Sequence, residues 1–235
     1  MNTTRFACFV TGTDTNVGKT LISCALLHAL AQQGVRAAGM KPVAAGAVQR
    51  GKVWHNDDAD ALIAASSVKL MPELATPYLL RAAASPHIAA AAENLTIGPS
   101  YIAACYQQIA SLADAVVVEG VGGFRVPLAK DYDTADMAVQ FGLPMVLVVG
   151  MRLGCLNHAL LTAESIAARG LKLAGWVANT IDPAMPHLAK NITTLQTLIS
   201  APLIGVVPHL PDTSVAGAAS HLDFSCLPGW PGKQY

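Results

Sequence analysis

Charged side chains are scarce in this sequence. Lys, Arg, Asp and Glu make up 13% of its 235 residues, whereas roughly 25% is usual in a soluble globular protein. Fifteen basic and fifteen acidic residues cancel to a net charge of zero at pH 7. No overall positive field exists to hold a polyphosphate backbone, so nucleic acid is not expected as a partner.

Long hydrophobic runs are also missing. The chain is 53% hydrophobic, which excludes an unfolded linker, yet no stretch reaches the roughly 18 to 20 apolar residues that a membrane-spanning helix needs. Residues 1–10 contain one Arg and no apolar segment followed by a small-residue cleavage site. We therefore predict a cytoplasmic protein with no membrane partner, in which residues 1–235 form a single domain.

The five cysteines contain no C-x-x-C pair, and their number is odd. This usage is typical of reduced thiols in the cytosol and does not favour disulfides or a zinc site. We interpret all five as small buried hydrophobic residues.

Short aliphatic runs alternate with longer helical segments along the chain. The runs are apolar throughout, which is typical of strands covered on both faces of a parallel sheet; they lie at 6–11, 37–40, 115–119, 145–149, 173–178 and 203–207. Helices are predicted at 19–33, 101–112, 134–140, 156–169 and 187–199, with a loop entering a helix within 82–92. The alternation predicts an α/β fold, a doubly wound and mostly parallel sheet with helices on both faces, in which ligands collect at the carboxyl ends of the strands. The residues after position 211 show no clear periodicity.

A phosphate-binding loop follows the first predicted strand. Gly12 begins the segment GTDTNVGKT, which ends in Gly18, Lys19 and Thr20 and opens a predicted helix. Backbone N–H groups and a helix N-terminus surround phosphate oxygens in such loops, while the Lys reaches the β- and γ-phosphates and the Thr hydroxyl faces Mg²⁺. The first glycine is one residue farther from the Gly-Lys-Thr group than in the standard spacing, so this is a variant phosphate loop.

Three further charged residues are candidates for the same site. Glu119 ends an apolar strand, where burial of a carboxylate is costly unless a cation or hydrogen-bond donors face it. Asp58 is either a metal ligand or an ordinary acidic residue in the first turn of a helix. Lys41 follows the second strand and is either an anion-binding or a solvated lysine.

The order of several motifs resembles the dethiobiotin synthetase family over residues 6–210. The motifs are TGTDT with VGKT at 11–20, KPVA at 41–44, the segment 56–62, SPH at 85–87, VEGVGG at 118–123, GCLNH at 154–158 and GWVAN at 175–179. The resemblance implies an ATP- and Mg²⁺-dependent ligase of P-loop NTPase type. Such a ligase closes a cyclic urea on 7,8-diaminononanoate with CO₂ in biotin synthesis, by way of a carbamate and a carbamic-phosphoric anhydride.

The resemblance also implies roles for individual residues. Catalysis is expected of Lys41, Lys19 and Thr13, and magnesium binding of Thr20, Asp58 and Glu119. The nucleotide-binding residues are expected to be Asn16, Val17, Gly18, Lys19, Thr20, Leu21, Asp58, Glu119, Gly120, Val121, Gly122, Asn179, Thr180, Pro208, His209 and Leu210. The substrate-binding residues are expected to be Lys41, Ala45, Ser85, Pro86, Gly154, Cys155, Leu156 and Asn157, the last four reached from the partner subunit of a homodimer.

Two positions depart from the family pattern. Asn16 stands where many members have an acidic residue, at a position that varies. Ala45 stands where a substrate-contacting Ser is common. The missing hydroxyl would remove one hydrogen bond to the substrate, a loss of about 0.5–1.5 kcal/mol.

Two other functions remain as alternatives. A switch ATPase of the kind that partitions DNA or positions division usually has an additional lysine near the start of its phosphate loop, where this chain has Thr13 and Asp14. A small-molecule kinase usually has an arginine-bearing lid over the phosphates. Arg125 and Arg152 are the candidates for such a lid, although neither lies in an Arg-rich segment.

Overall fold

All six predicted strands are present and form one parallel sheet. A computed structural model describes residues 6–210, 212 and 214–232; residues 1–5, part of the start from which a cytoplasmic location is predicted, lie outside this range. The strand order is β12-β11-β10-β1-β7-β2. The strands are β1 (Phe6–Gly12), β2 (Ala37–Met40), β7 (Ala115–Glu119), β10 (Met145–Gly150), β11 (Leu173–Asn179) and β12 (Leu203–Val207).

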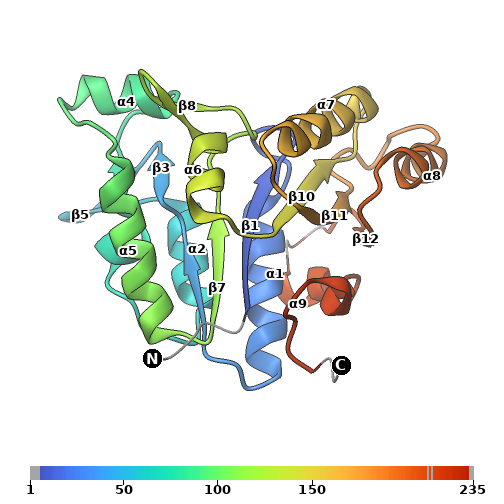
Figure 1. Ribbon diagram of the computed structural model, residues 1–235, viewed down its shortest axis with the longest axis horizontal. Helices are drawn as coiled ribbons and strands as arrows, with labels where there is room; N and C mark the ends of the chain where they lie inside the picture. The colour runs from blue at the N-terminus through green and yellow to red at the C-terminus, as the bar shows by residue number, and fades with distance from the viewer. Residues whose placement is uncertain (1–5, 211, 213, 233–235) are drawn as a thin grey trace.

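Helices cover both faces of this sheet, as predicted (Figure 1). Successive strand residues point to opposite faces, so Cys8 and Val10 of β1 lie in one core and Phe9 lies in another. The first core is closed by α1 (Lys19–Gln32), α2 (Asp57–Ala65) and α9 (Val215–Ala219). The opposite face carries α4 (Pro86–Ala92), α5 (Pro99–Leu112), α6 (Thr134–Phe141), α7 (Cys155–Ala168) and α8 (Leu188–Leu198). The α/β doubly wound fold is confirmed.

Several short elements beside the main sheet have no counterpart in the sequence prediction, because two to four residues show no usable periodicity. Strand β3 (Val43–Ala45) pairs in parallel with β6 (Tyr78–Leu80). Two antiparallel pairs are β4 (Val48–Arg50) with β5 (Val53–His55) and β8 (Pro127–Ala129) with β9 (Tyr132–Asp133). A short helix, α3 (Pro72–Ala75), precedes β6. The segments around β3 and β8 supply one side of the site described below.

The C-terminal segment is part of the core even though it has no periodic pattern. Helix α9 packs on α1 and is followed by the 3₁₀ turn η1 (Phe224–Cys226). The ring of Trp230 lies edge-on to Phe6, with centroids 5.3 Å apart, and 5.2 Å from the ring of Phe224. This segment therefore seals the α1 face of the sheet.

The cysteines behave as small apolar residues. Cys8, Cys24, Cys105 and Cys155 are free thiols and buried, as predicted, whereas Cys226 is only half-buried, and its thiol donates to the Asp223 carbonyl. Burial raises the pKa of Cys8 to about 12, which disfavours the reactive thiolate. Within the part of the chain that the structure describes, no helix is both long enough and apolar enough to cross a membrane.

Candidate active site

The phosphate loop joins β1 to α1 and is shaped by two residues with left-handed backbone. Asn16 has φ 59° and Gly18 has φ 95°. Such turns point backbone N–H groups into a concave anion site, and the first N–H groups of α1 have no acceptor within the helix. Lys19 is buried and donates from Nζ to the Asp14 carbonyl at 3.0 Å. The predicted loop is therefore present, with its lysine held against the loop itself.

Asn179, at the end of β11, braces this loop through a hydrogen bond from its side chain. Its Nδ2 donates to the Val17 carbonyl at 2.8 Å, and a Cβ at Gly18 would lie only 2.1 Å from the same nitrogen. Val17 itself is buried beside Gly12 and Gly150. Position 18 therefore requires glycine for two reasons, its backbone conformation and the space that Asn179 occupies.

Lys41, Asp58, Glu119 and Thr20 converge beneath the loop from four different elements. Lys41 Nζ donates to Asp58 Oδ2 at 2.8 Å and to Glu119 Oε1 at 2.5 Å, and the Thr20 hydroxyl donates to Glu119 Oε1 at 2.9 Å. Lys41 is 3% exposed and Glu119 is fully buried. Buried charges persist only when they are paired, so this contact explains how Glu119 remains in the core.

The pKa shifts follow from burial and from these pairs. Burial alone lowers the pKa of Lys41, but Glu119 and Asp58 outweigh burial and hold this pKa above its usual value. Burial raises the pKa of Asp58, but Lys41, together with Thr20 and Lys19, outweighs that effect and holds the pKa below its usual value. Burial, aided by the nearby charge of Lys41, lowers the pKa of Lys19 to about 8. A bound polyanion would reverse this last shift and keep Lys19 charged.

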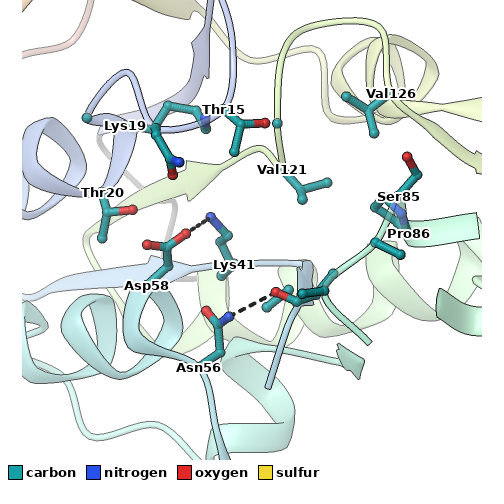
Figure 2. A pocket seen from close by; sticks show the side chains of 17 residues that line it. Thr15, Lys19, Thr20, Lys41, Asn56, Asp58, Ser85, Pro86, Val121 and Val126 are labelled. Atoms are coloured by element: carbon teal, nitrogen blue, oxygen red, sulfur yellow. Dashed lines mark hydrogen bonds and ion pairs between the residues drawn. The ribbon is translucent and has the colours of Figure 1, made fainter. Parts of the chain in front are cut away.

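A cavity of about 700 Å³ opens beside these residues. In Figure 2, Lys19, Thr20, Lys41 and Asp58 lie at one end, and Ser85 and Pro86 lie at the other. The predicted site residues that line the cavity are Asn16, Gly18, Lys19, Thr20, Lys41, Ala45, Asp58, Ser85, Pro86, Val121 and Gly122. Segments far apart in the sequence thus meet at one cavity that has cations at one end.

Six cavity residues are missing from the predicted set: Thr15, Ala44, Asn56, Ala83, Ala84 and Val126. Five of them lie within or next to predicted residues or motifs. Val126 does not, and it lies at the cavity because the loop after β7 passes there before β8 begins. Asn56 has a further role. Its Oδ1 accepts from the Ala59 N–H and its Nδ2 donates to the Ala45 carbonyl, both at 3.2 Å. Asn56 therefore ties the end of β3 to the helix that carries Asp58.

The other predicted residues lie outside this cavity. The Thr13 N–H donates to the Val148 carbonyl at 3.0 Å, so that N–H is committed to the fold. Leu21 packs against the α1-side core, and the Gly120 N–H donates to the Val10 carbonyl at 2.9 Å. Asn179 is the last residue of β11 and Thr180 follows it, while Pro208, His209 and Leu210 follow β12. Gly154, Cys155, Leu156 and Asn157 lie at the start of α7.

Both arginines considered for a kinase lid are paired with carboxylates, Arg125 with one on β9 and Arg152 with one on the phosphate loop itself. Arg125 Nε pairs with Asp133 Oδ2, and Arg152 Nη2 pairs with Asp14 Oδ2, both at 2.5 Å. Neither lines the cavity. This arrangement does not favour the kinase alternative.

The side chains predicted to hold magnesium fit that ion. Thr20, Asp58 and Glu119 offer hydroxyl and carboxylate oxygens, and Glu119 Oε2 is buried without a hydrogen-bond partner. Over the described residues, no three His, Cys, Asp or Glu side chains are grouped as a metal site. Magnesium does not need such a group, because it is commonly held by one or two carboxylates together with phosphate oxygens and water.

Comparison with known proteins decides the family. A model of the AAA domain matches residues 7–216. The protein described as ATP-dependent dethiobiotin synthetase BioD, from Janthinobacterium sp. (strain Marseille), is 60% identical over 233 residues, which cover 97% of this chain and 99% of that protein. The chain belongs to the dethiobiotin synthetase family. The resemblance found in the sequence motifs is thereby confirmed.

Two solved structures of other proteins share the fold of this chain. The septum site-determining protein MinD from Pyrococcus horikoshii OT3, complexed with Mg-ADP, has a TM-score of 0.54 and 16% identity over 92% of this chain and 87% of that one. A ParA family ATPase from Chlorobium tepidum TLS has a TM-score of 0.54 and 15% identity over 93% and 91%. At these identities the likeness extends to the fold alone.

Proposed function

We propose that the chain closes the ureido ring of dethiobiotin from 7,8-diaminononanoate, CO₂ and ATP, as an ATP-dependent ligase of biotin biosynthesis. The observation that carries this proposal is the 60% identity to a dethiobiotin synthetase over 97% of the chain. The geometry supports it, because a phosphate loop and the Lys41 cluster share one cavity with weakly polar residues at its far end.

The reaction needs no protein nucleophile. One amine of the substrate adds to CO₂ and loses a proton to give a carbamate. A carbamate oxygen attacks the γ-phosphorus of ATP, and ADP leaves. The second amine then attacks the carbamoyl carbon and loses a proton, phosphate leaves and the ring closes. Catalysis must therefore come from positioning and from stabilisation of negative charge.

Two lysines of this chain supply the positive charge for that stabilisation. Lys19, at the start of α1, is placed to bind the β- and γ-phosphates together with the N–H groups of the loop. Lys41, on the other side of the cavity, is placed to bind the carbamate and the transferring phosphoryl group. The Thr13 N–H, bonded to Val148, contributes by fixing the loop rather than by contacting phosphate.

Magnesium would be held by Thr20, Asp58 and Glu119, where it would supply positive charge to the phosphate oxygens. The orphaned Glu119 Oε2 supports this assignment. The shared fold with a MinD protein complexed with Mg-ADP is compatible with it.

The adenine is proposed to lie beyond the loop, against Asn179, Thr180, Pro208, His209 and Leu210. Pro208 and His209 are exposed at the end of β12, beside the end of β11. The Thr180 hydroxyl is buried without a hydrogen-bond partner. These features support polar contacts for the base at the same sheet edge as the phosphate loop.

The diamine is proposed to lie along Ala45, Ser85 and Pro86.

Replacing Asn56 with Ala is expected to raise the KM for the diamine about fivefold, because it removes the hydrogen bond to the Ala45 carbonyl, worth about 1 kcal/mol. Asn56→Ser keeps a helix-capping side chain but cannot reach Ala45. It should raise KM as much while losing less thermal stability. Steady-state kinetics and thermal denaturation check both variants, and a KM unchanged in both would remove Asn56 from the positioning of this strand.

A homodimer is proposed, with the substrate carboxylate bound by Gly154, Cys155, Leu156 and Asn157 of the partner subunit. These four residues lie at a helix N-terminus and do not line the cavity of their own chain. Leu153, just before α7, is 92% exposed, and Leu161, on α7, is 57% exposed. Two exposed leucines close in sequence to the predicted carboxylate site support a subunit contact there.

Replacing Leu153 with Glu is expected to shift the protein toward monomers and to raise the KM for the diamine. Light scattering after size-exclusion chromatography measures the first effect. Leu112→Glu, at the far end of α5, is the matched control and should leave the mass unchanged. A Leu153→Glu protein with unaltered mass and KM would place the contact elsewhere.

We further propose that residues 1–235 act as one P-loop ligase domain in the cytoplasm. The reaction itself is tested by supplying ¹³C-bicarbonate with ATP, Mg²⁺ and the diamine. The labelled carbon should appear in dethiobiotin, as measured by mass spectrometry, and its absence from any ring product would refute the proposed function.

A further inference from the structure

The Lys41 ammonium stands among the same side chains that are proposed to hold magnesium. Its Nζ lies 2.8 Å from Asp58 Oδ2 and 2.5 Å from Glu119 Oε1, and the latter oxygen also accepts from the Thr20 hydroxyl. Lys41 is 3% exposed. Its charge compensates the fully buried Glu119, which would otherwise be very costly to bury.

We infer that Lys41 is the internal counter-cation of this site, filling it before the metal binds and leaving it when the metal enters. The inference rests on the proposed metal ligands. A divalent cation held by the same two carboxylates, with Glu119 offering its unpartnered Oε2, would lie next to the Lys41 ammonium. The two cations repel each other at such close range, so Lys41 Nζ does not keep its bonds to Asp58 Oδ2 and Glu119 Oε1 once the metal is bound.

The displaced ammonium has a place to go. Lys41 lines the cavity as well as contacting the carboxylates, and its four-carbon stem allows Nζ to turn toward the cavity. There it would meet the transferring phosphoryl group and the carbamate. Metal binding would thus release Lys41 for its role in the reaction. In the metal-free enzyme, Lys41 would stay bonded to Asp58 and Glu119.

The inference predicts that removing Lys41 tightens metal binding in the absence of nucleotide. We would titrate Mn²⁺ into the nucleotide-free protein and follow free Mn²⁺ by electron paramagnetic resonance. Lys41→Met should bind about tenfold more tightly than the wild type, within the range usual for coupling between competing ligands. Lys41→Arg keeps the charge and should bind Mn²⁺ as weakly as the wild type.

Lys19→Met is the matched control for the general field. Lys19 is also buried nearby but bonds to the Asp14 carbonyl, not to the two carboxylates. Its loss should tighten Mn²⁺ binding by less than about threefold, since only a longer-range repulsion is removed. Unchanged affinity in Lys41→Met, or equal tightening in Lys19→Met, would overturn the inference.

Thermal denaturation distinguishes a change in metal affinity from misfolding of the variants. Without metal, Lys41→Met and the milder Lys41→Gln should both melt below the wild type, because Glu119 loses its partner. Mn²⁺ should then raise their Tm more than it raises that of the wild type. An equal rise in all three proteins would contradict displacement.

Failure of this inference can be told apart from failure of the proposed metal site by repeating the titration with ADP. If the wild type binds Mn²⁺ with ADP and Glu119→Gln abolishes that binding, the site stands, and an unchanged Lys41→Met result refutes only the counter-cation role. If Glu119→Gln has no effect with ADP, both proposals fall.

Discussion

Replacing Gly18 with alanine is expected to lower nucleotide affinity by about a hundredfold, from backbone strain in the left-handed region together with loss of the Asn179 brace. The φ of 95° disfavours any side chain, and the new Cβ would lie 2.1 Å from Asn179 Nδ2. Either the loop or Asn179 must move, and the Asn179 bond to Val17 would then be lost. Isothermal titration with ADP and Mg²⁺ measures the change.

Gly34→Ala is the matched control. Gly34 follows α1, has φ 72° and has open space around its Cβ position. This variant carries similar backbone strain without a clash and far from the cavity, so its thermal stability should fall slightly while its nucleotide affinity stays unchanged. An intact affinity in Gly18→Ala would show that the loop does not bind nucleotide in this conformation.

Replacing Lys41 with glutamine is expected to lower turnover by about 10²- to 10³-fold, the range found when a single charge-stabilising group is removed from a reaction site. Lys41 is proposed to act on the carbamate and the transferring group, whereas Lys19 and the loop are proposed to hold the nucleotide. ATP affinity should therefore remain close to that of the wild type. Pre-steady-state and steady-state phosphate release, together with ATP titration, separate the two effects.

Lys52→Gln serves as the comparison for this variant, since Lys52 is an exposed lysine on the turn between β4 and β5. It should leave turnover and ATP affinity unchanged. Wild-type turnover in Lys41→Gln would remove Lys41 from the reaction. Loss of ATP binding equal to the loss of turnover would instead assign it to the nucleotide.

Sequence patterns predict the main sheet well because buried parallel strands are continuous apolar runs with little ambiguity. All six strands are found at the predicted places, with ends that shift by one residue at most. The phosphate loop is equally easy to recognise in the sequence, because its chemistry demands Gly18, Lys19 and Thr20 in immediate succession after a strand. Scarcity of charge helps as well, since Lys41 and Glu119 stand out at strand ends and prove to be buried partners.

Other features depend on contacts that no local pattern contains. Lys41 meets Asp58 and Glu119 across 17 and 78 residues of sequence, so the two bonds of its ammonium emerge only with the fold. The tie from Asn56 to Ala45 depends on the pairing of β3 with β6, which is three residues long. Trp230 enters the core through ring contacts with Phe6 and Phe224, not through a helical or strand period.

We propose that this cavity couples ATP cleavage to capture of a diamine carbamate. The most direct test is phosphate release by the purified protein with ATP, Mg²⁺ and bicarbonate, measured with and without 7,8-diaminononanoate. We predict that phosphate release requires the diamine and matches dethiobiotin one to one. Phosphate released at the same rate without the diamine would contradict this coupling.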